Sequence, residues 1–132
     1  EAAAATNPHL RYLGPRSREE VDAAMRSAKA LLFPSIWYEG MPMVILECFS
    51  VGTPVIASRL GTMGELIQEG VNGRLFEPGD PASLRSVVED LLDDSEDLRG
   101  MSAGARRCWE THYAPETNFA LLRKIYEGVC RS

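Results

Sequence analysis

Two kinds of hydrophobic pattern alternate along the first 80 residues of the chain. Short apolar runs closed by glycine or proline are typical of strands, whereas apolar residues that recur every three or four positions predict amphipathic helices. The predicted strands cover residues 9–13, 30–33, 54–58 and 74–76, and residues 30–33 fit a strand buried on both faces. Because strands that alternate with helices form parallel sheets, we expect an α/β fold. It would be a Rossmann-like, mostly parallel sheet with helices on both faces, followed by C-terminal helices.

The first two predicted helices carry clear boundary signals. Ser17 and Glu20 match a capping box, which predicts a helix of about ten residues from that point. Residues 43–51 are apolar nearly all round, and this predicts a buried helix. Pro42 suits the first turn of this helix, and Gly52 suits the left-handed residue that ends it.

The second half of the chain is predicted to be mainly helical. After a loop over residues 59–64, we expect one or two helical turns over residues 65–69. Asp80 caps a long amphipathic helix, a second helix covers residues 98–109, and Pro115 opens a third. As a bare amphipathic helix, this third one could belong to the same core.

Composition narrows the possible functions. The chain has 132 residues, which suits one compact domain, and its formal net charge is -5. Nucleic acids and anionic membranes attract basic surfaces, so neither is expected to be the main partner. No apolar run approaches the roughly 20 residues of a membrane span.

The cysteines and the first residues suggest where the chain belongs. Cys48, Cys108 and Cys130 are too far apart in sequence for a metal-binding CxxC motif. We therefore expect free thiols in a reducing compartment, the cytoplasm. Residues 1–5 read Glu-Ala-Ala-Ala-Ala, without a Met or the features of a signal peptide. Such a run is typical of a helix end, so we expect the chain to be part of a longer protein.

The loop over residues 35–42 is the strongest candidate for a ligand site, because open α/β sheets bind ligands beyond the carboxyl ends of their strands. Glu39 lies just before the predicted buried helix and could simply interact with its positive end. Glu47 lies inside that helix and could be an exposed residue; if it is buried, it needs a partner such as ligand hydroxyls. Pro42 and Glu47 are five residues apart, about 7–8 Å along the axis. That spacing suits a diphosphate at the helix start and a ribose at Glu47.

Three further residues near the predicted site leave alternatives open. Trp37 and Tyr38 could line a sugar site, since aromatic faces suit sugar rings, or they could pack in the core. Arg59, directly after the third predicted strand, could reach a bound anion or form a surface ion pair. None of the three decides the function by itself.

An ordered series of motifs resembles one enzyme family. Residues 39–47 have the E-x7-E form of retaining GT-B glycosyltransferases, in the large group that includes bacterial wall and polysaccharide transferases. The resemblance extends over roughly residues 10–126. The other matching segments are Leu31-Leu32-Phe33-Pro34-Ser35, Gly52-Thr53-Pro54-Val55-Ile56-Ala57-Ser58, Gly64-Glu65-Leu66-Ile67 and Gly70-Val71-Asn72-Gly73.

The resemblance implies a donor site for a nucleotide-diphosphate sugar, UDP- or GDP-linked. Glu39 would be the catalytic residue and would bind hydroxyls of the donor sugar, while Glu47 would bind the ribose. The loop near Arg16 would offer backbone groups to the base. The sugar and the diphosphate would meet the backbone of Gly40, Met41, Pro42 and Met43. Such enzymes generally need no metal or cofactor, and the chain has no DxD motif.

The same resemblance implies that residues 1–132 are an incomplete nucleotide-sugar-binding domain, the C-terminal half of a GT-B fold. Its first βα unit, an Arg and Lys pair that neutralises the diphosphate, and the acceptor-binding N-terminal domain would lie outside the chain. The last helix would pack toward that missing domain, and any membrane contact would be made through it.

The whole protein would then transfer a hexosyl unit to an acceptor with retention of configuration, and the isolated chain is expected to be inactive. The alternative is a non-catalytic nucleotide-binding or regulatory α/β module. A GT-B-fold epimerase or phosphorylase would need catalytic groups that the motifs do not supply.

Overall fold

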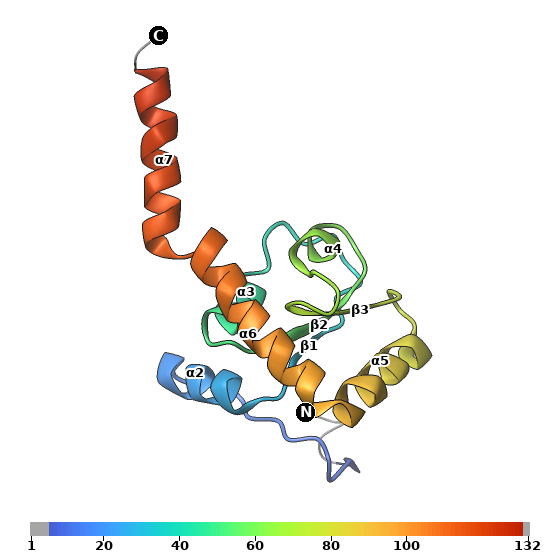
Figure 1. Cartoon of the computed structure of the whole chain (residues 1–132). Helices are drawn as coiled ribbons and strands as arrows, with labels where there is room; N and C mark the ends of the chain where they lie inside the picture. Colours follow the sequence, from blue (N-terminus) through green and yellow to red (C-terminus); the bar gives the residue numbers. More distant parts are fainter. Residues whose placement is uncertain (1–5, 131–132) are drawn as a thin grey trace.

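The computed structural model describes residues 6–130 and contains a three-stranded parallel sheet with the strand order β1-β2-β3 (Figure 1). The strands are β1 (Leu31–Phe33), β2 (Val55–Ser58) and β3 (Gly73–Phe76). In the register, Val55 of β2 lies between Leu31 of β1 and Gly73 of β3. The parallel sheet and the α/β class are confirmed.

Helices follow each strand and form the end of the chain. They are α2 (Arg18–Ser27), α3 (Met43–Ser50), α4 (Thr62–Leu66), α5 (Pro81–Asp93), α6 (Ser95–His112) and α7 (Pro115–Val129). The capping box predicted at Ser17 and Glu20 is present, and the carboxylate of Asp80 caps α5. Gly52 has a φ of +76°, as expected of the left-handed residue after α3.

Both faces of the sheet are covered, as the sequence predicts. Val55 and Ala57 of β2 pack with α3, α4 and the second half of α6 in one core cluster. Ile56, which points to the opposite face, packs with Leu91 of α5 and Met101 of α6 in another. Helix α6 therefore contributes to both clusters. Its Ser102 hydroxyl donates a 2.5 Å hydrogen bond to the Gly52 carbonyl, at the turn that leads into β2.

Two glycines allow the close contacts of this core. A Cβ on Gly73 would lie 2.0 Å from the Val55 carbonyl oxygen, and a Cβ on Gly104 of α6 would lie 1.8 Å from the Val71 carbonyl oxygen. Real Cβ atoms do not approach carbonyl oxygens so closely. The close approach of β3 to β2 and the close approach of α6 to Val71 therefore both require a residue without a side chain.

Two of the strand predictions are wrong. Residues 9–13 form no strand: they are all exposed, and none of them pairs with a strand of the sheet, so their backbone groups can bond to water. Strand β1 is not buried on both faces, since Leu32 is 48% exposed. The reason is its position: β1 lies at the edge of the sheet.

The short helix is displaced from its predicted place. It covers Thr62–Leu66 instead of residues 65–69, and it begins directly after Gly61, whose φ is +50°. The hydroxyl of Thr62 donates a 3.0 Å hydrogen bond to the Glu39 carbonyl, so a contact with a distant loop fixes the first turn.

Helix α7 extends away from the rest of the molecule (Figure 1), and none of its residues is buried. The idea that its apolar face belongs to this core is therefore wrong. The exposed apolar residues are Phe119, Leu121, Leu122, Ile125, Tyr126 and Val129. No helix in residues 6–130 is long and apolar enough to cross a membrane.

Candidate functional site

The candidate site lies where the loops after β1 and β2 meet at the carboxyl ends of the strands. The Thr62 hydroxyl joins the second loop to the Glu39 backbone, as described above. A Cβ on Gly61 would lie 3.0 Å from Cδ1 of Tyr38, so the tyrosine ring lies directly against this glycine. The two loops therefore form one continuous surface next to the start of α3.

Glu39 is held in place by its own loop. Its Oε1 accepts a 2.7 Å hydrogen bond from the Ser35 hydroxyl, and the Ser35 oxygen in turn accepts the backbone N–H of Trp37 at 3.3 Å. The side chain is partly buried. Since this bond engages only Oε1, a carboxylate of fixed orientation presents Oε2 for a ligand donor such as a sugar hydroxyl.

The start of α3 offers backbone amides to a ligand. Pro42 is the N-cap residue and its side chain cannot accept a hydrogen bond, so no side chain of the N-cap satisfies the first amides of the helix. Before it, a Cβ on Gly40 would meet no atom within 4 Å, so open space borders the backbone at that point. The methionines on either side of Pro42, Met41 and Met43, are both exposed. The positive end of α3 is therefore accessible to an anion.

Glu47 has a partner that the sequence did not reveal. Its Oε1 accepts a 2.7 Å hydrogen bond from a terminal nitrogen of Arg18, at the start of α2. The Glu47 side chain is 27% exposed, so it is only partly buried, and the partner that the structure gives it is Arg18; its contact with a ribose stays a prediction. This hydrogen bond, followed by the charge of Glu47, raises the pKa of Arg18 above its ordinary value. The two residues are 29 positions apart, and no local sequence signal connects them.

The Arg16 side chain pairs with α2 and not with α3. Its guanidinium pairs with Glu20, one turn further along, at 3.1 Å. Arg16, Glu20, Arg11 and Leu13 line a shallow hollow between the extended N-terminal segment and α2. The structure thus brings the loop of Arg16 close to the middle of α3 through Arg18, while the Arg16 side chain itself stays with α2.

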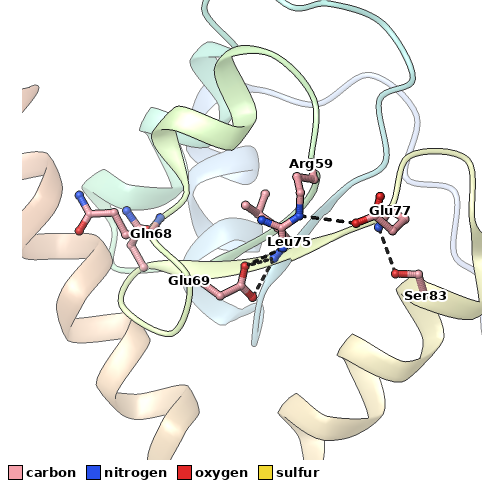
Figure 2. Close-up of polar contacts among 7 residues, drawn as sticks. Arg59, Gln68, Glu69, Leu75, Glu77 and Ser83 are labelled. Atoms are coloured by element: carbon pink, nitrogen blue, oxygen red, sulfur yellow. Dashed lines mark hydrogen bonds and ion pairs between the residues drawn. The ribbon is translucent and has the colours of Figure 1, made fainter.

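The alternatives left open for the neighbouring residues are now decided in part. The Arg59 guanidinium lies 3.4 Å from a carboxylate oxygen of Glu69 and 3.6 Å from one of Glu77, so it forms surface ion pairs (Figure 2). Glu69 also accepts the backbone N–H of Leu75, and the Ser83 oxygen accepts that of Glu77. This network anchors the C-terminal half of β3.

The two aromatic residues of the loop are not core residues. Trp37 is 74% exposed and Tyr38 is 82% exposed, at the rim of the candidate site. Their contact with a sugar stays a prediction. Among residues 6–130, no group of three His, Cys, Asp or Glu side chains could hold a metal ion.

Comparison with known proteins identifies the family. The sequence profile described as "Glycosyl transferases group 1" matches residues 2–107. The chain is 34% identical over 121 residues to the uncharacterized glycosyltransferase MJ1178 of Methanocaldococcus jannaschii, covering 92% of this chain and 34% of that protein.

Solved structures show the same fold. The sucrose-phosphate synthase of Thermosynechococcus elongatus matches 98% of this chain and 32% of its own, with a TM-score of 0.86 and 22% identity. Anabaena Alr3699/HepE in complex with UDP matches 96% of this chain and 34% of its own, with a TM-score of 0.82 and 21% identity. The chain spans about a third of the length of these relatives. The profile match and the shared fold lead to one conclusion: the chain belongs to the glycosyl transferases group 1 family and has the fold of part of a GT-B glycosyltransferase.

Proposed function

We propose that this chain is the nucleotide-sugar donor-binding domain of a retaining hexosyltransferase. The observation that carries the proposal is the arrangement of α3: Glu39 is oriented by Ser35 just before the helix, and Glu47 lies about one turn after its first residue, Met43. The uncapped start of the helix lies between them. In a member of the glycosyl transferases group 1 family, this arrangement suits a ligand with a sugar, a diphosphate and a ribose in a row.

Each part of the donor would have its own partner. Glu39 would bind hydroxyls of the transferred sugar, and Glu47 would bind the ribose hydroxyls. The backbone from Gly40 to Met43 would meet the sugar and the diphosphate, whose negative charge grows as it leaves and is stabilised by the positive end of α3. The loop containing Arg16 would meet the base. The donor would be UDP- or GDP-linked, and no metal or cofactor is assigned a role.

The Anabaena Alr3699/HepE protein, which shares the fold, has also been crystallised with UDP-glucose. This supports a nucleotide sugar as the ligand class for the present chain. The structural likeness is at 21% identity, so the base and the sugar are left to experiment.

We further propose that the chain acts within a longer protein, because it spans about a third of the relatives that it matches. The partner would be an N-terminal, acceptor-binding domain, which together with a basic pair for the diphosphate completes the reaction site. The isolated chain would then transfer no sugar. Its three free cysteines support a reducing location, the cytoplasm.

Nucleotide binding tests this proposal most directly. In the full-length protein that carries this chain, we expect UDP or GDP to bind in calorimetric titrations. Glu47→Gln should weaken that binding by about 10- to 100-fold, the range for losing hydrogen bonds to a charged group. Glu89→Gln is the matched control, because Glu89 is an exposed residue of α5 that pairs only with Arg85 in the contacts described.

The outcomes separate the candidate functions. Nucleotide binding with transfer of the sugar supports the enzyme, whereas binding without transfer to any acceptor favours the non-catalytic or regulatory module. Unchanged affinity in Glu47→Gln would show that the ribose role is wrong. The anomeric configuration of the product, followed by NMR, decides whether the transfer is retaining.

A further inference from the structure

The ion pair between Arg18 and Glu47 connects the two helices that border the nucleoside end of the proposed donor site. Arg18 is the first residue of α2, directly after the loop that contains Arg16. Its terminal nitrogen lies 2.7 Å from Glu47 Oε1, and its Nε lies 3.3 Å from Asp22. The guanidinium is thus held from its own helix by Asp22 and reaches across to α3.

This pair contributes little to the stability of the fold. The Arg18 side chain is 64% exposed, and exposed ion pairs are screened by water and lose side-chain entropy on forming. The adjacent hydrogen bond of Ser50 goes to the backbone carbonyl of Glu47 and does not restrain its carboxylate. Among the hydrogen bonds and ion pairs described, Arg18 alone fixes the direction of that carboxylate.

The carboxylate keeps room for a ligand. An ionised carboxylate has about four acceptor positions, and Arg18 uses one of them on Oε1. The remaining positions can accept two neighbouring hydroxyls, such as those at C2′ and C3′ of a ribose. The Arg18 guanidinium therefore restricts the rotation of the Glu47 carboxylate and leaves acceptor positions on it free for the two hydroxyls of a diol.

We propose that Arg18 is a positioning residue that orients Glu47 for the two ribose hydroxyls and so selects ribonucleotide donors. The inference rests on the proposed function, because it takes Glu47 as the ribose ligand. Arg18 makes no contact with the donor in this scheme and acts only through Glu47. Because α2 begins at the base-binding loop, the same residue also ties the position of that loop to the ribose contact.

A comparison of ribonucleotides with dideoxynucleotides, combined with a double-mutant cycle, tests whether Arg18 acts through Glu47 on the ribose hydroxyls. In the full-length protein, the affinities of UDP and GDP, and of their 2′,3′-dideoxy counterparts, are measured for wild type, Arg18→Met, Glu47→Gln and the double variant. We expect Arg18→Met to weaken binding of the ribonucleotide about tenfold and to leave the dideoxynucleotide unchanged. In the Glu47→Gln background, Arg18→Met should have no further effect.

Two further variants control for charge and folding. Arg18→Lys keeps a positive charge and should restore part of the lost affinity. Arg85→Met removes an exposed arginine that pairs with Glu89 on α5, far along the chain from the site, and should leave both affinities unchanged. Thermal unfolding of each variant confirms that the fold is intact.

Several results would overturn the inference. Tighter binding in Arg18→Met would show that Arg18 competes with the ribose. Equal losses for the ribonucleotide and the dideoxynucleotide would show that Arg18 acts on the base, the phosphates or the fold. If Glu47→Gln loses affinity and Arg18→Met does not, this inference fails while the proposed function stands; if wild type binds no nucleotide, both fail.

Discussion

The hydroxyl of Ser35 donates a 2.7 Å hydrogen bond to Oε1 of Glu39, across the loop that follows β1. The same oxygen accepts the backbone N–H of Trp37, which fixes the hydroxyl in turn. Ser35, which lies just after the end of β1, therefore sets the orientation of Glu39, the residue proposed to bind the donor sugar. A loop built in this way presents the carboxylate with little freedom before any donor arrives.

Replacing Ser35 by alanine therefore tests whether the orientation of Glu39 matters for transfer. In the full-length protein, we expect kcat to fall about tenfold or more, because a hydrogen bond to a charged group is lost. The KM for the donor should change little, since Glu39 itself remains. Steady-state kinetics measure both values.

Two serine variants make this test specific. Ser35→Thr keeps the hydroxyl and should recover most of the activity. Ser27→Ala removes a hydroxyl that bonds only to a backbone carbonyl in the last turn of α2, so its rates should equal those of wild type. A Ser35→Ala protein with normal kcat would contradict the positioning role.

Gly104 and Gly100 form a natural pair for testing how α6 is seated. A Cβ on Gly104 would clash with the Val71 carbonyl, whereas a Cβ on Gly100 meets no atom within 4 Å. Gly104→Ala should lower the free energy of unfolding by about 1–3 kcal/mol, because α6 must move away from this carbonyl. Gly100→Ala should raise it by up to about 1 kcal/mol, because alanine is the better helix former. Denaturant titrations measure both, and equal effects would contradict the predicted contact.

The buried thiol of Cys48 should make the free energy of unfolding depend on pH. Its burial, and then the negative charge of Glu47, raise the pKa of Cys48 to about 11. An unfolded thiol titrates near pH ~8.5, so the folded state holds this proton more tightly. The stabilisation is fully present below that pH and is lost as the pH rises through about 11, by up to about 3 kcal/mol.

Cysteine variants separate this effect from other titrations at high pH. Cys48→Ala should flatten the fall in unfolding free energy between about pH 9 and 11, as measured by denaturant titration. Cys130→Ala removes an exposed cysteine at the end of α7 and should leave the slope as it is in wild type. The same slope in all three proteins would show that Cys48 does not carry the effect.

Two isoleucines distinguish the core from the unpartnered helix. Ile45 of α3 is 0% exposed, and Ile125 of α7 is 64% exposed. Ile45→Ala should lower the free energy of unfolding by about 2–5 kcal/mol, because it leaves a cavity in the core. Ile125→Ala should change it by less than about 0.5 kcal/mol in the isolated chain. A large loss from Ile125→Ala would mean that α7 packs on this chain in solution.

The parts of the fold that were predictable depend on residues close together in sequence. The capping box joins Ser17 and Glu20, which are three positions apart, and the side chain of Asp80 caps the amides of the next two helical residues that follow Pro81. Such contacts form within one turn, so the pattern of the sequence reveals them. The alternation of strands and helices, and with it the parallel sheet, followed from the same local patterns.

The failed predictions all concern contacts between distant segments. Residues 9–13 have the pattern of a strand but pair with no strand among the described residues. Helix α4 begins earlier than predicted, at Thr62, whose hydroxyl donates a hydrogen bond to the Glu39 carbonyl. The apolar face of α7 is not buried against any other described residues. A local pattern states what a segment prefers, while a strand or a buried face also needs a surface to pair with.

For the site, the sequence by itself identified the family motif, the two glutamates and the helix that separates them. Only the tertiary structure showed that Ser35 orients Glu39, that Arg18 reaches Glu47 from 29 positions away, and that Arg59 is already paired. The difference has one physical cause. Residue type and spacing specify the helix and its ends through short-range hydrogen bonds, but the partner of a charged side chain depends on which segments the folded core brings together.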